Sequence, residues 1–139
     1  ASFIIATGAA AMGKPVTMFF TFWGLNVLRK DEHIPIKKNF LEKMFGKMMP
    51  RGPEKLGLSK MNFGGAGSKL MKHMMKKHNV VSLNELIEMA KELDIKMVAC
   101  TMSMDVMGIQ KEELIDGIEY AGVATYLAEA EEGNVNLFI

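Results

Sequence analysis

Apolar residues along the chain fall into short continuous runs and helical stripes, a pattern typical of α/β proteins. The first run, residues 2–13, is apolar on nearly all sides, which predicts a buried helix ending at Gly13. The next run, PVTMFFTFW at 15–23, is rich in aromatic and β-branched residues and predicts a buried strand. A helix followed by an apolar strand is a building unit of parallel sheets.

The second half of the chain repeats this helix-then-strand order. Ser82 and Glu85 have capping-box spacing, an apolar stripe follows them to Leu93, and an apolar strand begins near Ile95. The remaining pieces are a short helical segment at 111–117, an extended stretch at 117–122, a helix at 123–133 and a strand at 135–139. We therefore predict one α/β domain over residues 1–139, with a mostly parallel sheet covered by helices on both faces.

A Met-rich helical insert, at about 32–78, separates the two halves. It contains two amphipathic helices, whose apolar stripes are Ile36, Phe40, Leu41, Met44, Phe45, Met48 and Met49 in the first and Leu70, Met71, Met74 and Met75 in the second. Seven of the 14 methionines lie here, beside His73 and His78, and these are ligand types that suit Cu(I). Methionine at helical spacing more commonly forms flexible core or an interaction surface, so we expect oligomer contacts or a lid.

The formal net charge of +1 conceals a strong asymmetry. Residues 29–78 hold 13 Lys or Arg against 4 Asp or Glu, whereas residues 79–139 hold 3 against 12. This segregation is consistent with a solvated surface, with opposite faces that meet between subunits, or with a basic docking patch for an acidic partner. No nucleic-acid-binding module or aromatic stacking pattern is present, so we expect no nucleic-acid partner.

The stretch GAAAMGKP at 8–15 resembles a phosphate-binding loop. Pro15 replaces the hydroxyl residue that would coordinate magnesium, and the predicted order is helix to strand instead of strand to helix. We therefore expect no nucleotide to bind there.

The N-terminal region is almost free of charge but does not predict a membrane span. Lys14 and Pro15 divide residues 1–28 into pieces of 13 and 14 residues on either side of the lysine, well short of the roughly 20 that a spanning helix needs. These residues contain no basic n-region with a cleavage site, so they do not suggest secretion. We expect a cytoplasmic protein without a transmembrane segment.

Cys100 is the candidate catalytic residue. It ends an apolar strand, and ligands of parallel sheets bind where strands end. We expect the next helix to begin around Asp105, where its N-terminus would lower the thiol pKa while the Asp105 carboxylate would oppose this or cap the helix. The predicted supporting pocket consists of Thr21, Trp23, Gly24, Asn26, Thr101, Met102, Ser103, Met104 and Asp105. The simpler alternative is that Cys100 is a small core residue.

Four segments carry a family resemblance: FIIATGAAAMGKPVTMFFTFWGLNVLRK, MNFGGAG, KMVACTMSMDVMGI and EELIDGIEYAGVATYL. In this order they resemble the DsrE/DsrF-like family, in its Met-rich sulfurtransferase branch. The resemblance implies a three-layer α/β/α sandwich, homo-oligomerisation, and a cysteine that carries sulfane sulfur as a persulfide, a role that would belong to Cys100. Relatives open with another strand before FIIATG, so we expect an N-terminal strand to be missing from this sequence.

The leading hypothesis is therefore a sulfur-transfer protein that works with persulfide donor or acceptor proteins, without a metal or organic cofactor. One alternative is a non-catalytic binding or assembly subunit whose insert docks a redox or sulfur-trafficking partner. The third hypothesis is a Cu(I)-binding protein.

Overall fold

A sheet of three parallel strands forms the centre of the computed structural model, which describes residues 1–36, 38–57 and 63–133. The strands are β1 (Thr17–Phe20), β2 (Lys96–Cys100) and β3 (Glu119–Ala121), and β2 lies between the other two. Both strand pairs are parallel, which confirms the predicted parallel sheet. The predicted strand at 135–139 lies outside the described residues.

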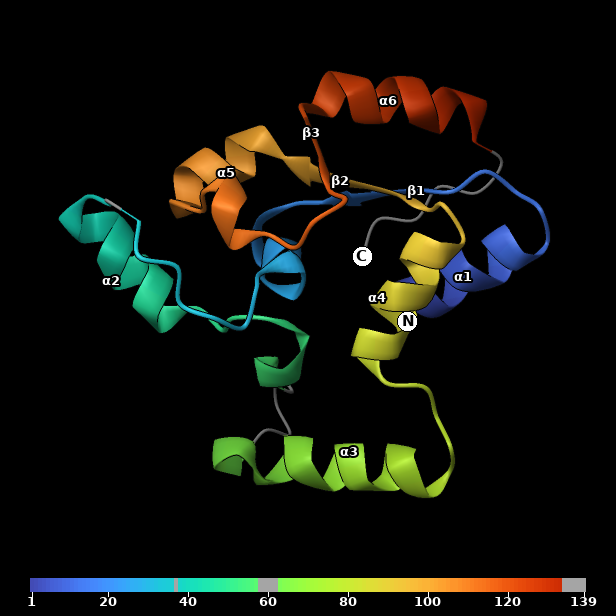
Figure 1. The fold of residues 1–139 in the computed structure, drawn as a ribbon, viewed down its shortest axis with the longest axis horizontal. Helices are drawn as coiled ribbons and strands as arrows, with labels where there is room; N and C mark the ends of the chain where they lie inside the picture. The colour runs from blue at the N-terminus through green and yellow to red at the C-terminus, as the bar shows by residue number, and fades with distance from the viewer. Residues whose placement is uncertain (37, 58–62, 134–139) are drawn as a thin grey trace.

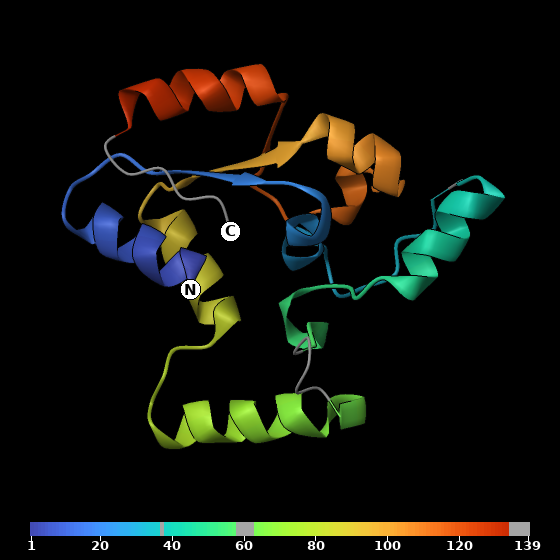
Figure 2. The same ribbon diagram turned by 180° about the vertical axis from the view of Figure 1, so that it is seen from behind.

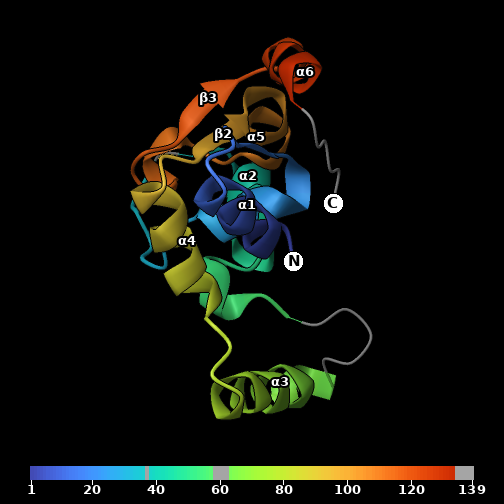
Figure 3. The ribbon, with the colours of Figure 1, turned by 90° about the vertical axis from the view of Figure 1, so that its right-hand side faces the viewer.

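Helices cover both faces of the sheet, which confirms the three-layer α/β/α arrangement (Figures 1 and 3). One face carries α6 (Val123–Glu132), whose Glu129 accepts hydrogen bonds from Thr17 Oγ1 at 3.1 Å and Lys96 Nζ at 2.6 Å. The opposite face carries α1 (Ser2–Ala11) and α4 (Leu83–Glu92), as Figure 2 shows from behind.

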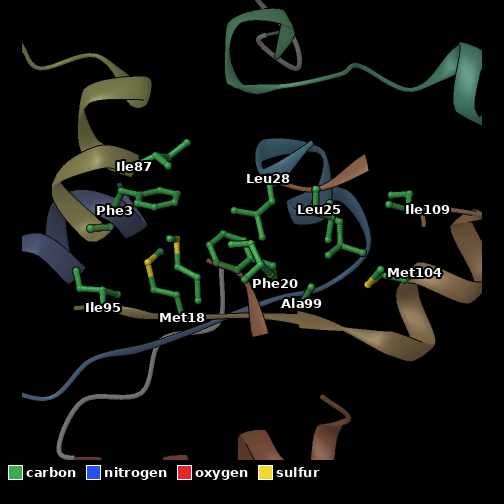
Figure 4. Packing of buried hydrophobic residues seen from close by; sticks show 14 of the residues in the cluster. Phe3, Met18, Phe20, Leu25, Leu28, Ile87, Ile95, Ala99, Met104 and Ile109 are labelled. Carbon is green, nitrogen blue, oxygen red and sulfur yellow. The ribbon is translucent and has the colours of Figure 1, made fainter. Parts of the chain in front are cut away.

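The hydrophobic core lies between the sheet and the layer of α1 and α4 (Figure 4). Alternation along β1 directs Met18 and Phe20 into this core, while Phe19 turns to the other face and stacks on Tyr126 with ring centroids 5.1 Å apart. Full burial of one such side chain contributes about 1.5–3 kcal/mol. The core is therefore one-sided, and α6 has no buried residue.

Local sequence signals lie at two of the helix ends. Gly13, two residues after α1, has φ +74°, which glycine adopts without steric cost. Ser82 Oγ accepts from the Glu85 N–H at 3.3 Å, and Glu85 Oε2 accepts from the Ser82 N–H at 2.7 Å, so the predicted capping box is confirmed. The segment at 8–15 runs from helix to strand, as predicted.

The predicted strand at 15–23 is too long. β1 stops at Phe20 and the chain turns into the 3-10 helix η1 (Phe22–Leu28). Phe22 has φ +38°, in a region that bulky residues rarely adopt. The turn starts where β1 leaves the sheet, and tertiary packing here overrides the β preference of the aromatic residues.

The Met-rich insert forms two amphipathic helices, α2 (Phe40–Met48) and α3 (Ala66–Lys77), as predicted. Neither helix has a buried residue, and α3 stands apart from the sheet in all three ribbon views. The short 3-10 segments η2 (Pro53–Lys55) and η3 (Phe63–Gly65) connect them. Among the described helices, none combines the length and apolar character needed to cross a bilayer.

After β2, the helix α5 (Thr101–Met107) leads into the 3-10 segment η4 (Lys111–Glu113). Gly108 ends α5 with φ +61°, and a Cβ built there would lie 2.7 Å from Cγ of Glu42 on α2. Gly108 therefore permits the close approach of α2 to α5.

A buried ion network joins the insert to this core. Glu113 is 1% exposed, and its carboxylate accepts from Arg29 at 3.1 Å, from Arg51 at 2.8 Å and from Lys38. Arg29 directly follows η1, Lys38 precedes α2 and Arg51 follows α2. One carboxylate thus connects three segments that are far apart in the sequence.

The network stabilises the ionised form of Glu113. Burial alone would raise the pKa of Glu113, but hydrogen bonds from Lys38 and from the Gln110 N–H, with the charges of Lys38 and Arg29, lower it from 4.5 to about 2. Because the folded pKa lies below the unfolded value, this stabilisation is present above about pH 4.5 and is lost as pH falls toward 2.

We predict that Glu113→Gln lowers the free energy of unfolding by about 3–5 kcal/mol at pH 7, because it leaves buried cations without their counter-charge. Urea denaturation at a series of pH values measures this. The difference in the free energy of unfolding between wild type and variant should become smaller as pH falls from 4.5 toward 2.

The neighbouring Glu112 is exposed, so Glu112→Gln is the matched control and should change stability by no more than about 0.5 kcal/mol. Equal effects of the two substitutions would show that the network does not stabilise the fold.

Candidate active site

Cys100 is the last residue of β2, the central strand, as predicted for the site. Met97 and Ala99 belong to the core on the α1 and α4 side. Lys96 bonds to Glu129 of α6 on the other side. Alternation along the strand therefore places the Cys100 thiol on the α6 face of the sheet.

The strand register brings two further residues beside the thiol. Ala121 is paired with Cys100, and α6 begins two residues later at Val123. Phe20 is paired with Ala99, so Thr21, which is also extended, continues β1 next to Cys100 on the same face. The carboxyl ends of all three strands therefore converge on the thiol.

The start of the following helix differs from the prediction. Cys100 itself is the N-cap residue and α5 begins at Thr101, not around Asp105. Asp105 lies inside α5, where it is exposed and its carbonyl accepts from the Gly108 N–H at 3.2 Å. The predicted capping role of Asp105 is wrong, because the chain enters the helix directly from the strand.

The other predicted pocket residues on α5 separate according to the helix face. Met104 is buried in the core, Thr101 is half-buried and Met102 is 60% exposed. Ser103 is fully buried, and its Oγ has no hydrogen-bond partner among the described residues. In an N-cap geometry the side chains of the N-cap and N3 positions lie on the same side of the helix start. Ser103 occupies the N3 position relative to the N-cap residue Cys100, so its side chain lies on the same side of the helix start as the thiol.

The residues predicted to follow β1 have different roles. Trp23 is 67% exposed on η1, and the Gly24 N–H donates to Thr21 O at 2.8 Å, closing the turn. Asn26 is fully buried, donates to Trp23 O at 3.2 Å and accepts from Arg29 at 3.4 Å. Asn26 therefore belongs to the turn and to the ion network.

Exposed apolar side chains surround the carboxyl edge of the sheet. We call this set the apolar rim: Phe22 and Trp23 after β1, Met102 and Val106 after β2, and Val123 and Leu127 after β3. The thiol itself is 3% exposed, although sulfur exchange requires access to it. Sequence reasoning missed four of the six residues of the apolar rim: Phe22, Val106, Val123 and Leu127. The signal at Phe22 was only an aromatic residue in a predicted strand.

Two further features bear on the choice of chemistry. A groove of about 510 Å³ runs along β1 between α1 and α6, and among the described residues its lining includes Thr21 and Gly24 but not Cys100.

His73 and His78 lie on α3 and at its end, both exposed. The described residues contain no group of three His, Cys, Asp or Glu side chains arranged to hold a metal ion.

Sequence comparison gives three matches over nearly the whole chain. The sequence model of the DsrE/DsrF/DrsH-like family matches residues 1–138. The chain is 67% identical over 139 residues to the uncharacterized protein YrkE of Bacillus subtilis, covering 100% of this chain and 87% of that protein. It is 39% identical over 141 residues to the sulfur carrier protein DsrE2 of Allochromatium vinosum, covering 99% of this chain and 87% of that protein. The family resemblance seen in the sequence is thus confirmed, and the chain belongs to the DsrE/DsrF/DrsH-like family.

Proposed function

We propose that the protein transfers sulfane sulfur, which it carries as a persulfide on Cys100. The observation that carries this proposal is the position of the thiol at the end of the central strand, where all three strand ends converge. Cys100 is also the only cysteine in the sequence, so it is the one thiol available to hold sulfur. The similarity to a sulfur carrier protein supports the same role.

The proposed exchange needs no oxidant or cofactor. The Cys100 thiolate attacks the outer sulfur of a donor persulfide, R–S–SH; the new S–S bond forms as the donor S–S bond breaks, and R–S⁻ leaves. The product is Cys100–S–SH. An acceptor thiolate then attacks its outer sulfur, which gives the acceptor persulfide and restores the Cys100 thiolate.

We propose that the apolar rim docks the partner protein that donates or accepts this sulfur. Trp23, Met102 and Val106 are each more than half exposed and flank the strand ends that surround Cys100. Removal of apolar surface from water contributes about 25 cal/mol per Å² before the costs of association. In the docked complex, the partner would shield the persulfide from water. A local opening of the structure around Cys100 would give the partner access to the thiol.

We further propose that the exchange takes place in the cytoplasm. A reducing compartment keeps a lone thiol free for sulfur exchange. Fractionation of cells followed by immunodetection of the protein would test this, and recovery from the extracellular fraction would contradict it.

We predict that the wild-type protein gains the mass of one sulfur atom after incubation with a persulfide donor, and that a reductant removes it. Cys100→Ser should lose this gain completely because no other thiol is present. Mass spectrometry of the intact protein measures both. The substitution should change stability by about 1 kcal/mol, a typical value for a point mutation.

A folded wild-type protein that stays unmodified by persulfide donors and by alkylating agents would contradict the carrier role. In that case the non-catalytic binding subunit becomes the better explanation. Circular dichroism of wild type and Cys100→Ser provides the control for folding.

Ser103 is the proposed positioning residue for the bound sulfur. Its buried hydroxyl finds no partner among the residues that the structure describes, and leaving such a donor unpaired costs roughly 1–3 kcal/mol, which a hydrogen bond to the persulfide would offset. We predict that Ser103→Ala speeds transfer of the loaded sulfur to a small thiol by about tenfold. This factor corresponds to about 1.4 kcal/mol less stabilisation of the persulfide. Stopped-flow kinetics measures the rate. Thr101→Ala, a substitution at the half-buried first residue of α5, is the control and should leave the rate unchanged.

We also propose that the protein is a homo-oligomer and that the apolar faces of α2 and α3 contact another subunit. Phe40, Leu41 and Met48 on α2 are more than 60% exposed, and α3 presents Leu70, Met71 and Met74. Exposed apolar patches of this kind commonly mark interaction sites.

We predict that combining Met71→Glu with Met74→Glu shifts the protein to a smaller species in analytical ultracentrifugation, because two charges would be buried in the contact. Lys69→Glu on the polar side of the same helix changes the charge equally and should leave the mass unchanged. If neither variant alters the sedimentation of an oligomeric wild type, α3 does not form the contact.

A further inference from the structure

Three cations share one carboxylate beneath α5. Arg29 is fully buried, and the side chains of Lys38 and Arg51 are 8% and 14% exposed. Among the described residues, Glu113 is the carboxylate within ion-pair distance of these three groups. Three positive charges against one negative charge leave a formal excess of +2 in the cluster.

Within residues 1–36, 38–57 and 63–133, no second carboxylate forms an ion pair with Arg29, Lys38 or Arg51. Asp116 pairs with Lys30 at 3.4 Å, outside the cluster. Asp31 is exposed and lies against Gly52, and Glu32 contributes its backbone carbonyl, which accepts from Arg51 at 3.3 Å. Buried charge that is not fully balanced is costly, so three cations that share one carboxylate favour binding of a further counter-ion.

The cluster also has unused hydrogen-bond donors. Arg29 Nε is buried and has no partner among the described residues. In the described part of the chain, the other side-chain hydrogen bonds of these cations go to neutral oxygens: Asn26 Oδ1 at 3.4 Å from Arg29, the Gly108 carbonyl at 2.6 Å from Lys38 and the Glu32 carbonyl from Arg51. Guanidinium groups present several N–H donors in a planar fork that matches the oxygens of carboxylates, phosphates and sulfates.

The surroundings of Arg29 are consistent with this excess. Burial lowers the pKa of the Arg29 guanidinium, the charge of Arg51 lowers it further, and Glu113 opposes both. The contacts with Glu113 therefore do not fully offset the effects of burial and of the Arg51 charge on this guanidinium.

We propose that Arg29, Lys38 and Arg51 form a binding site for a small oxyanion with two negative charges, which enters at Arg51, where the cluster reaches solvent. Such a dianion would balance the excess of +2. Sulfate, hydrogen phosphate and thiosulfate share this chemistry. Bound sulfate or hydrogen phosphate would stabilise the fold, whereas bound thiosulfate would be a store of sulfane sulfur.

This site is separate from the thiol. Lys38 binds the carbonyl of Gly108, which ends α5, whereas Cys100 precedes the first residue of the same helix. At about 1.5 Å per residue, the length of α5 separates them by roughly 10 Å. The anion site therefore does not depend on the proposed persulfide chemistry.

Isothermal titration calorimetry at constant ionic strength tests the proposal with sodium sulfate, phosphate, thiosulfate and chloride. We expect at least one of the dianions to saturate a single site per chain, and chloride to show no saturation. Arg51→Gln and Lys38→Gln should each weaken that binding by about tenfold or more, since a charge-assisted hydrogen bond is lost.

Lys43→Gln is the matched control, because it removes an exposed charge from α2 outside the cluster and should leave the affinity unchanged. Cys100→Ser should also retain the affinity, since the two sites are separate. If thiosulfate binds most tightly, the ligand is a compound with sulfane sulfur. If sulfate or phosphate binds most tightly, the ligand is an oxyanion without sulfane sulfur. Absence of saturation with every dianion, unchanged binding in folded Arg51→Gln and Lys38→Gln, or loss of binding in Cys100→Ser would overturn the proposal.

Discussion

Pairing of β2 on both edges is the constraint on which the geometry of the thiol depends. The strand is hydrogen-bonded to β1 on one side and to β3 on the other, so its last residue has a fixed place. All three strands are parallel, and their carboxyl ends meet at the same edge. The segments after them, η1, α5 and α6, therefore begin around Cys100 with little freedom to move away.

The order of helices and strands could be predicted from the sequence because it depends on local signals. Ser82 and Glu85 satisfy each other at the start of α4, and the apolar residues that follow repeat at helical spacing. The end of β1 was less predictable. Aromatic residues occupy four of the five positions from Phe19 to Trp23, and only packing around the sheet decides that Phe22 leaves it.

The position of Cys100 at a strand end was predictable, but the choice between a buried and an accessible thiol was not. Burial depends on how α5 and the opposite layers pack, which no local pattern specifies. The ion network was also beyond sequence reasoning. Its members, Arg29, Lys38, Arg51 and Glu113, come from four separate segments, and along the chain they appear only as parts of a basic and an acidic half.

The position of the Met-rich insert affects how the chain closes on itself. Thr17 pairs with Lys96, a separation of 79 residues, whereas Val98 pairs with Glu119 only 21 residues away. The loop-closure entropy grows with the logarithm of length, so the first pairing costs only about 1 kcal/mol more than the second. Long-range pairing slows folding more than it lowers stability. The insert between β1 and β2 therefore lowers the stability of the folded state only slightly. Its larger effect is to slow the assembly of the sheet.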